Sequence, residues 1–150
     1  MELGLTDRIV VVGGTSADDL DACAAALSAE GAETLRVQSF DGLAPEVDTV
    51  LREHGRIDGV VVHLPAAVPT SVLDRGLAGL VRAWEPVEAV AEAYRAALPA
   101  MIEQGRGRLV SVLTGAVKWL SDDMDEPGAV AARRFWGCTR RSSLMPHAMA

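Results

Sequence analysis

Short apolar segments alternate along this chain with segments in which apolar residues have a helical spacing. Two of the apolar segments, RIVVVG and IDGVVVHL, are continuous and rich in valine. Runs of this kind are typical of strands that are buried on both faces of a parallel sheet. Together with two weaker segments, they predict four strands, at residues 8–13, 33–40, 57–64 and 108–113.

Four helices are expected between these strands. The first begins with Ser16 as its N-cap and ends at Gly31, which suits a helix terminus. Its apolar positions fall at i, i+3, i+4 and i+7, on Leu20, Cys23, Ala24 and Leu27. The other helices are predicted at residues 45–55, 71–83 and 86–104. The order βαβαβααβ favours an α/β fold in which helices cover a parallel sheet.

Composition and charge narrow the possible functions. The chain has 150 residues, which favours one domain, and it is 49% hydrophobic and 23% charged, which is typical of a globular protein. The net charge of −7, without a basic stripe, argues against a nucleic-acid partner. No apolar run approaches the roughly 18 residues of a membrane span, and the first residues do not resemble a signal peptide. We therefore expect a cytoplasmic protein without a nucleic-acid or membrane partner.

The distribution of charge changes near the end of the chain. All 21 acidic residues lie at or before Glu126, whereas residues 127–150 contain four arginines. We expect one domain over residues 1–126, with residues 127–150 as its degenerate C-terminal helix and tail. The acidic run at 121–128 lacks the register of a calcium loop, and the cysteines and histidines lack zinc spacing, so no metal site is expected.

Three segments resemble the short-chain dehydrogenase/reductase family. They are LGLTDRIVVVGGTS, similar to its first strand and turn; HGRIDGVVVHLPAA, similar to its G-x-I-D strand and N-N-A-G motif; and AALPAMIEQGRGRLVSVLT, similar to its long helix and serine-bearing strand. They occur in the family's order over almost the whole chain. The resemblance implies a Rossmann-like, doubly wound parallel sheet, here shortened to about four to five strands. It also implies a nicotinamide cofactor and an Asn-Ser-Tyr-Lys catalytic set.

The cofactor-binding positions of the family are altered in this chain. Its T-G-x-x-x-G-x-G turn falls on residues 13–20, where Asp18 and Leu20 replace two glycines that let the backbone approach the pyrophosphate. Acids at the start of this helix also oppose an anion. The candidate cofactor-binding residues are Gly13, Gly14, Ser16, Asp41 and His63. We expect no cofactor, or weak NAD(P) binding; alternatively, the segment is a capped surface helix and His63 bonds to the backbone.

The spacing between the first and third predicted strands is also short. Only 50 positions separate Gly13 from His63, which is about one βα unit fewer than the family pattern requires. This deficit predicts that the family's second and third strands are merged and that the helix between them is missing.

The catalytic set implied by the resemblance is incomplete. Tyr94 is the single tyrosine and Lys118 the single lysine, so no Tyr-x-x-x-Lys motif exists. The family's serine position falls on Thr114 or Gly115. Tyr94 is expected to be a packing residue.

These observations favour a protein without dehydrogenase activity that acts through subunit association, as a homo-oligomer or as the partner of an active relative. Helices 72–83 and 86–104 would form the contact. The apolar stripe of the second helix comprises Val87, Val90, Ala91, Tyr94, Ala97, Leu98 and Met101, and it would equally suit covering the chain's own sheet. Two alternatives stay open: an NAD(P)H-dependent reductase that uses Thr114 and His63, and a truncated or frameshifted fragment.

Overall fold

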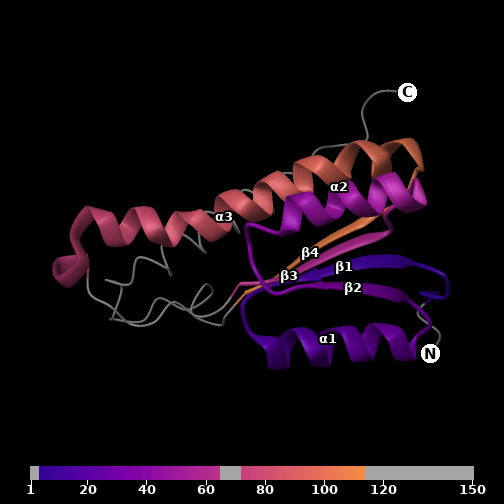
Figure 1. The fold of residues 1–150 in the computed structure, drawn as a ribbon, viewed down its shortest axis with the longest axis horizontal. Helices are drawn as coiled ribbons and strands as arrows, with labels where there is room; N and C mark the ends of the chain where they lie inside the picture. Colours follow the sequence, from indigo (N-terminus) through magenta and orange to yellow (C-terminus); the bar gives the residue numbers. More distant parts are fainter. Residues whose placement is uncertain (1–3, 65–71, 114–150) are drawn as a thin grey trace. The chain divides into compact units, whose positions relative to one another are not determined.

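The computed structural model describes residues 4–64 and 72–113, which form four strands and three helices (Figure 1). In chain order these are β1 (Ile9–Gly13), α1 (Ala17–Ala29), β2 (Glu33–Val37), α2 (Leu43–His54), β3 (Gly59–His63), α3 (Val72–Glu103) and β4 (Arg108–Val112). The chain divides into two units. One consists of Met1–Pro65 and Glu88–Val112, and the other of Ala66–Val87 and Leu113–Ala150.

The four strands form one parallel sheet in the order β2-β1-β3-β4. This confirms the predicted parallel α/β sheet and its four strands. The chain passes from β1 to β2 on one side and then to β3 on the other side of β1. The strand order therefore reverses between β1 and β3, and the carboxyl ends of all four strands lie at one edge.

Helices cover both faces of the sheet in the first unit. Helix α1 lies on one face, while α2 and residues 88–103 of α3 lie on the other (Figure 1). On the α1 face, Val10 and Val12 pack with Leu20. Val11 and Val60 point the opposite way, because side chains alternate along a strand, and both are completely buried.

Between Gly13 and His63 the chain forms a single strand, β2, and two helices. The spacing predicted this shortening by one βα unit. Helix α2 follows β2 directly, and the next strand pairs with the far side of β1. Among the described residues, β2 is therefore an edge strand.

Helix α3 corrects one expectation from the sequence. Two helices were predicted, at 71–83 and 86–104, and the structure has a single helix, Val72–Glu103, with Pro86 inside it. A proline inside a helix loses one backbone hydrogen bond and costs about 3 kcal/mol. The residues that flank Pro86, such as Ala83 and Glu88, favour helix, and no glycine lies near enough to end it there. One unfavourable residue is therefore insufficient to separate the two segments.

A buried carboxylate joins the amino ends of three strands. The Oδ1 atom of Asp58 accepts hydrogen bonds from Arg8 Nη1 at 3.1 Å and Arg106 Nε at 3.0 Å, and its Oδ2 accepts one from the backbone N–H of Ile9 at 3.1 Å. Arg56 Nε lies 3.8 Å from Oδ2. Burial raises the pKa of Asp58, but the hydrogen bonds from Ile9, Arg8 and Arg106 outweigh it and leave this pKa below its usual value.

We predict that Asp58→Asn lowers the free energy of unfolding by about 1–3 kcal/mol, because it weakens hydrogen bonds to a buried carboxylate while the arginines stay partly exposed to water. The lowered pKa also makes this contribution depend on pH. It is fully present above the carboxyl's ordinary pKa near 3.8 and is lost as the pH falls through the lower folded-state pKa. Urea unfolding between pH 3 and 7 measures both effects. The exposed Asp48→Asn serves as control, and equal stability of the two variants would contradict this role.

Candidate functional site

The carboxyl edge of the sheet is the place where this fold offers a binding crevice. In open parallel sheets, ligands bind outside the carboxyl ends of the strands, at the point where the strand order reverses. Here that point lies between β1 and β3. Gly13 and Gly14 are at the end of β1 and His63 is at the end of β3, so the structure brings these three predicted residues to the crevice.

Neighbouring protein atoms leave no room for a side chain at either glycine. A Cβ at Gly13 would lie 2.1 Å from Cδ2 of Leu43, a fully buried residue of α2. A Cβ at Gly14 would lie 2.9 Å from the backbone carbonyl oxygen of His63. The absence of side chains at these positions therefore lets α2 and β3 approach β1. Atoms of α2 and β3 fill the space that side chains would occupy.

Ser16 is the N-cap of α1, as predicted. Its Oγ accepts a hydrogen bond from the backbone N–H of Asp19, with 3.4 Å between nitrogen and oxygen. Asp18 and Asp19 are exposed in the first turn. This helix terminus, which would favour a bound anion, thus carries two carboxylates of its own. Leu20, the second residue in place of a family glycine, has its side chain buried against the sheet.

Asp19 and His63 meet across the crevice between β1 and β3. The Nδ1 atom of His63 lies 3.2 Å from Oδ2 of Asp19, close enough for an ion pair when the imidazole is protonated. This nitrogen is buried and makes no hydrogen bond of suitable geometry. Bonding of Nδ1 to the backbone, the alternative that the sequence left open for His63, is therefore not observed.

Asp41 follows the carboxyl end of β2, the edge strand that pairs with β1. It is exposed in the loop between β2 and α2, where Ser39 Oγ accepts a hydrogen bond from the backbone N–H of Gly42 at 3.2 Å. Within the described residues, no hydrogen bond or ion pair joins Asp41 to Gly14, Ser16 or His63. Thr114 and Lys118 fall outside the described residues.

Tyr94 forms a polar pair that the sequence did not reveal. Its hydroxyl lies 2.7 Å from Oγ of Ser111 on β4, and the phenol is partly buried. Burial raises the pKa of Tyr94, and the hydrogen bond with Ser111 offsets only part of this rise. The phenol is therefore protonated at neutral pH, unlike a catalytic tyrosine whose pKa is lowered by a nearby cation. Side chains alternate between the two faces of the strand in RLVSVL, and this alternation places Ser111 on the face that α3 covers.

Within residues 4–64 and 72–113, no three His, Cys, Asp or Glu side chains are grouped so that they could hold a metal ion. The helices of that part of the chain include none that is long and apolar enough to cross a membrane.

Solved structures with the same fold include several dehydrogenases. Aldohexose dehydrogenase from Thermoplasma acidophilum, in ligand-free form, matches 96% of this chain with a TM-score of 0.78 and 16% identity. A short-chain type dehydrogenase/reductase from Mycobacterium marinum matches 93% with a TM-score of 0.69 and 16% identity. NAD⁺-bound xylitol dehydrogenase matches 94% with a TM-score of 0.66 and 17% identity. No protein-family model and no curated protein matches the sequence.

These similarities confirm the expected resemblance at the level of the fold. The chain has the Rossmann-like fold of short-chain dehydrogenases, with four parallel strands between helices. It spans 63% of the length of the aldohexose dehydrogenase, 69% of the M. marinum protein and 65% of the xylitol dehydrogenase.

The described residues do not fit the pyrophosphate of a nicotinamide dinucleotide. The backbone at Gly14 is in contact with β3, the hydroxyl of Ser16 caps its own helix, and Asp19 reaches His63 at the end of β3. A dinucleotide at this edge would place its phosphates beside Asp18 and Asp19. No reaction step through this cofactor is derived from the site.

We predict that the chain binds NAD(H) and NADP(H) no more tightly than about 1 mM, a binding free energy of about −4 kcal/mol. The double variant Asp18→Asn/Asp19→Asn should bind about three- to thirtyfold more tightly, because each charge at a helix terminus contributes about 0.3–1 kcal/mol. Titration calorimetry measures both, with Asp48→Asn as a matched control on α2. Micromolar affinity of the unmodified chain would contradict this assignment.

Proposed function

We propose that this chain is a cytoplasmic protein with the fold of the short-chain dehydrogenases but without their activity, and that it acts by associating with a second copy of itself. The observation that carries the first part is the contact between Asp19 and His63. This contact occupies the crevice between β1 and β3, where proteins of this architecture bind their ligands.

The family's general acid for carbonyl reduction, the tyrosine of its Tyr-x-x-x-Lys motif, has no counterpart in this sequence, whose single tyrosine and single lysine are 24 positions apart. The raised pKa of Tyr94 supports a packing role, in which its hydroxyl holds Ser111. Loss of a positioned acid lowers the rate about 10²–10⁴-fold in enzymes that depend on one. A damaged cofactor site would reduce turnover further.

The second part of the proposal rests on the outer face of α3. Val90, Ala97 and Met101 of the predicted stripe are buried within the chain's own unit, so they cover its sheet. Leu98 remains 45% exposed, and Ile102, which the stripe did not include, is 70% exposed. These two residues are four apart and therefore lie on one side of the helix. They form a small apolar face, with Ala91 and Arg95 in line with it.

A second copy is the simplest occupant of this face. A two-fold contact would place Leu98 of one copy against Ile102 of the other, because such an interface pairs the same surface of both chains. Arg95 and Glu92, which already form an ion pair, would lie at its rim. A full-length protein of the same fold is the alternative partner.

We predict that the purified chain catalyses no oxidation or reduction on panels of alcohols and carbonyl compounds with NAD(H) or NADP(H). The assay follows nicotinamide absorbance at enzyme concentrations high enough to detect slow turnover. Turnover that disappears in His63→Ala or Thr114→Ala would overturn the proposal and support an unusual reductase.

We further predict that the chain is a dimer in light scattering and that Leu98→Glu/Ile102→Glu makes it a monomer with an unchanged melting temperature. An unpaired buried carboxylate costs about 3–5 kcal/mol in an interface, whereas an exposed one costs little. Ala26→Glu, at an exposed position of α1, is the matched control and should leave the dimer intact.

Two outcomes separate the parts of this proposal. A monomeric parent chain that also fails to bind a full-length relative would contradict association without affecting the account of the crevice. If the parent chain is monomeric alone but forms a dimer with that relative, the relative is the partner instead of a second copy.

A further inference from the structure

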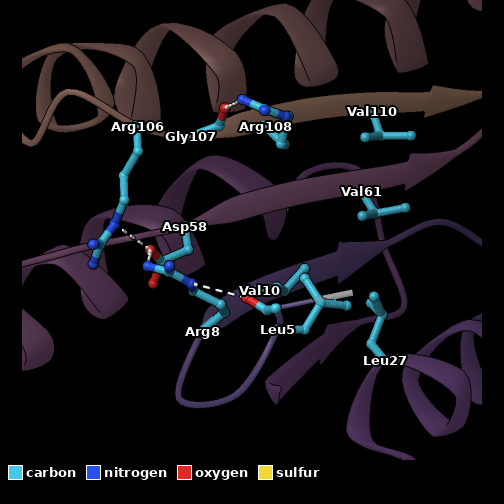
Figure 2. A pocket seen from close by; sticks show the side chains of 11 residues that line it. Leu5, Arg8, Val10, Leu27, Asp58, Val61, Arg106, Gly107, Arg108 and Val110 are labelled. Atoms are coloured by element: carbon cyan, nitrogen blue, oxygen red, sulfur yellow. Dashed lines mark hydrogen bonds and ion pairs between the residues drawn. The ribbon is translucent and has the colours of Figure 1, made fainter. Parts of the chain in front are cut away.

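A pocket of about 370 Å³ lies at the amino end of the sheet, opposite the edge that binds cofactors in this fold (Figure 2). All its lining residues belong to the first unit of the chain. They come from the segment before β1, from α1, and from the three strands β1, β3 and β4. The volume is at the lower end of the range of about 300–1,000 Å³ for pockets that bind small molecules.

The pocket has a charged end and an apolar end. Figure 2 shows the guanidinium groups of Arg8 and Arg106 turned toward Asp58 at one end. The side chains of Val61, Val110 and Leu27 lie at the other end, away from the arginines. A ligand that fills this space would meet cationic groups with its head and aliphatic side chains with its body.

The charged end has more positive than negative charge. Arg8, Arg106 and Arg108 line the pocket, and Asp58 is its single acidic lining residue. Asp58 already accepts hydrogen bonds from Arg8, from Arg106 and from the N–H of Ile9. Arg108 donates to the carbonyl of Gly107, and among the described residues no carboxylate pairs with it. Guanidinium N–H groups are therefore available for an anion.

The apolar end is open because α1 covers only part of its face of the sheet. Helix α1 packs on β1 and β2, and it buries Val10 and Val12 of β1. Farther along the sheet, Val61 is half-buried and Val110 is 41% exposed. Apolar side chains on this face are thus adjacent to the cationic end and are available for contact with a ligand.

We propose that this pocket binds a small amphiphilic carboxylate, whose head pairs with Arg106 and Arg108 and whose aliphatic part lies on Val61 and Val110. A carboxylate matches the planar fork of a guanidinium through two hydrogen bonds. A neutral apolar molecule would leave the guanidinium groups at the charged end unpaired, and a cation would be repelled by them. This proposal does not depend on the association through α3.

Decanoate is the probe for the test, used with the full chain and below the concentration at which it forms micelles. Titration calorimetry should give saturable binding with one molecule per chain. Decanol and decyltrimethylammonium have the same aliphatic part with a neutral and a cationic head. Both should bind at least about tenfold more weakly, because a charge-assisted hydrogen bond is lost.

Two variants test whether decanoate binds in this pocket. Arg108→Gln should weaken decanoate binding at least about tenfold, and it leaves the hydrogen bonds of Asp58 intact, so the fold is retained. Val110→Asp, at an exposed strand position, should weaken binding by placing a carboxylate beside the aliphatic part. Arg95→Gln, on the outer side of α3, is the matched control and should bind like the parent chain.

Three results would overturn the proposal. They are no saturable binding of decanoate, equal binding of decanol, and equal binding by Arg108→Gln and the parent chain. Backbone amide shifts in NMR provide a second readout: decanoate should move the signals of Arg108 and Val110 and leave those of Gly14 and His63 unchanged. Shifts confined to the carboxyl edge would also contradict it.

Discussion

The arrangement of the strands in this fold depends on the hydrogen bonds made by the buried carboxylate of Asp58. It precedes β3, and it binds the backbone of Ile9 in β1 and the side chain of Arg106, two residues before β4. One buried group therefore ties together the amino ends of three neighbouring strands. A buried charge of this kind is retained only when hydrogen bonds replace its lost hydration, and three such bonds do so here.

The same strands determine what their two edges can bind. At the carboxyl edge, close approach of β1 and β3 puts Gly14 against the carbonyl of His63, and Asp19 then reaches the imidazole. We propose that this contact obstructs the crevice that other proteins of this fold use. At the amino edge, the arginines that hold Asp58 leave cationic groups beside uncovered aliphatic side chains. The fold is shared with the dehydrogenases, but a shared fold does not by itself specify the chemistry at the edges of the sheet.

Local patterns in the sequence predicted most of the fold. The valine runs gave β1 and β3, and the capping serine, Ser16, gave the start of α1. The stripe on α3 was only partly interpretable, because apolar spacing does not distinguish Ala97, which is completely buried, from the exposed Leu98. The contact between Asp19 and His63 and those of Arg8 and Arg106 with Asp58 join residues that are more than 40 positions apart. Such contacts are created by the strand order, which no local pattern specifies.

We propose that Asp19 and His63 obstruct the crevice in which proteins of this fold bind their cofactor. The most direct test follows the backbone amide signals of residues 13–19 and His63 by NMR while NADH or NADPH is added to millimolar concentration. We expect these signals to stay in place, apart from changes that equal amounts of simple salts also produce. Saturable shifts that are specific to the nucleotide and centred on Gly14 and His63 would contradict it.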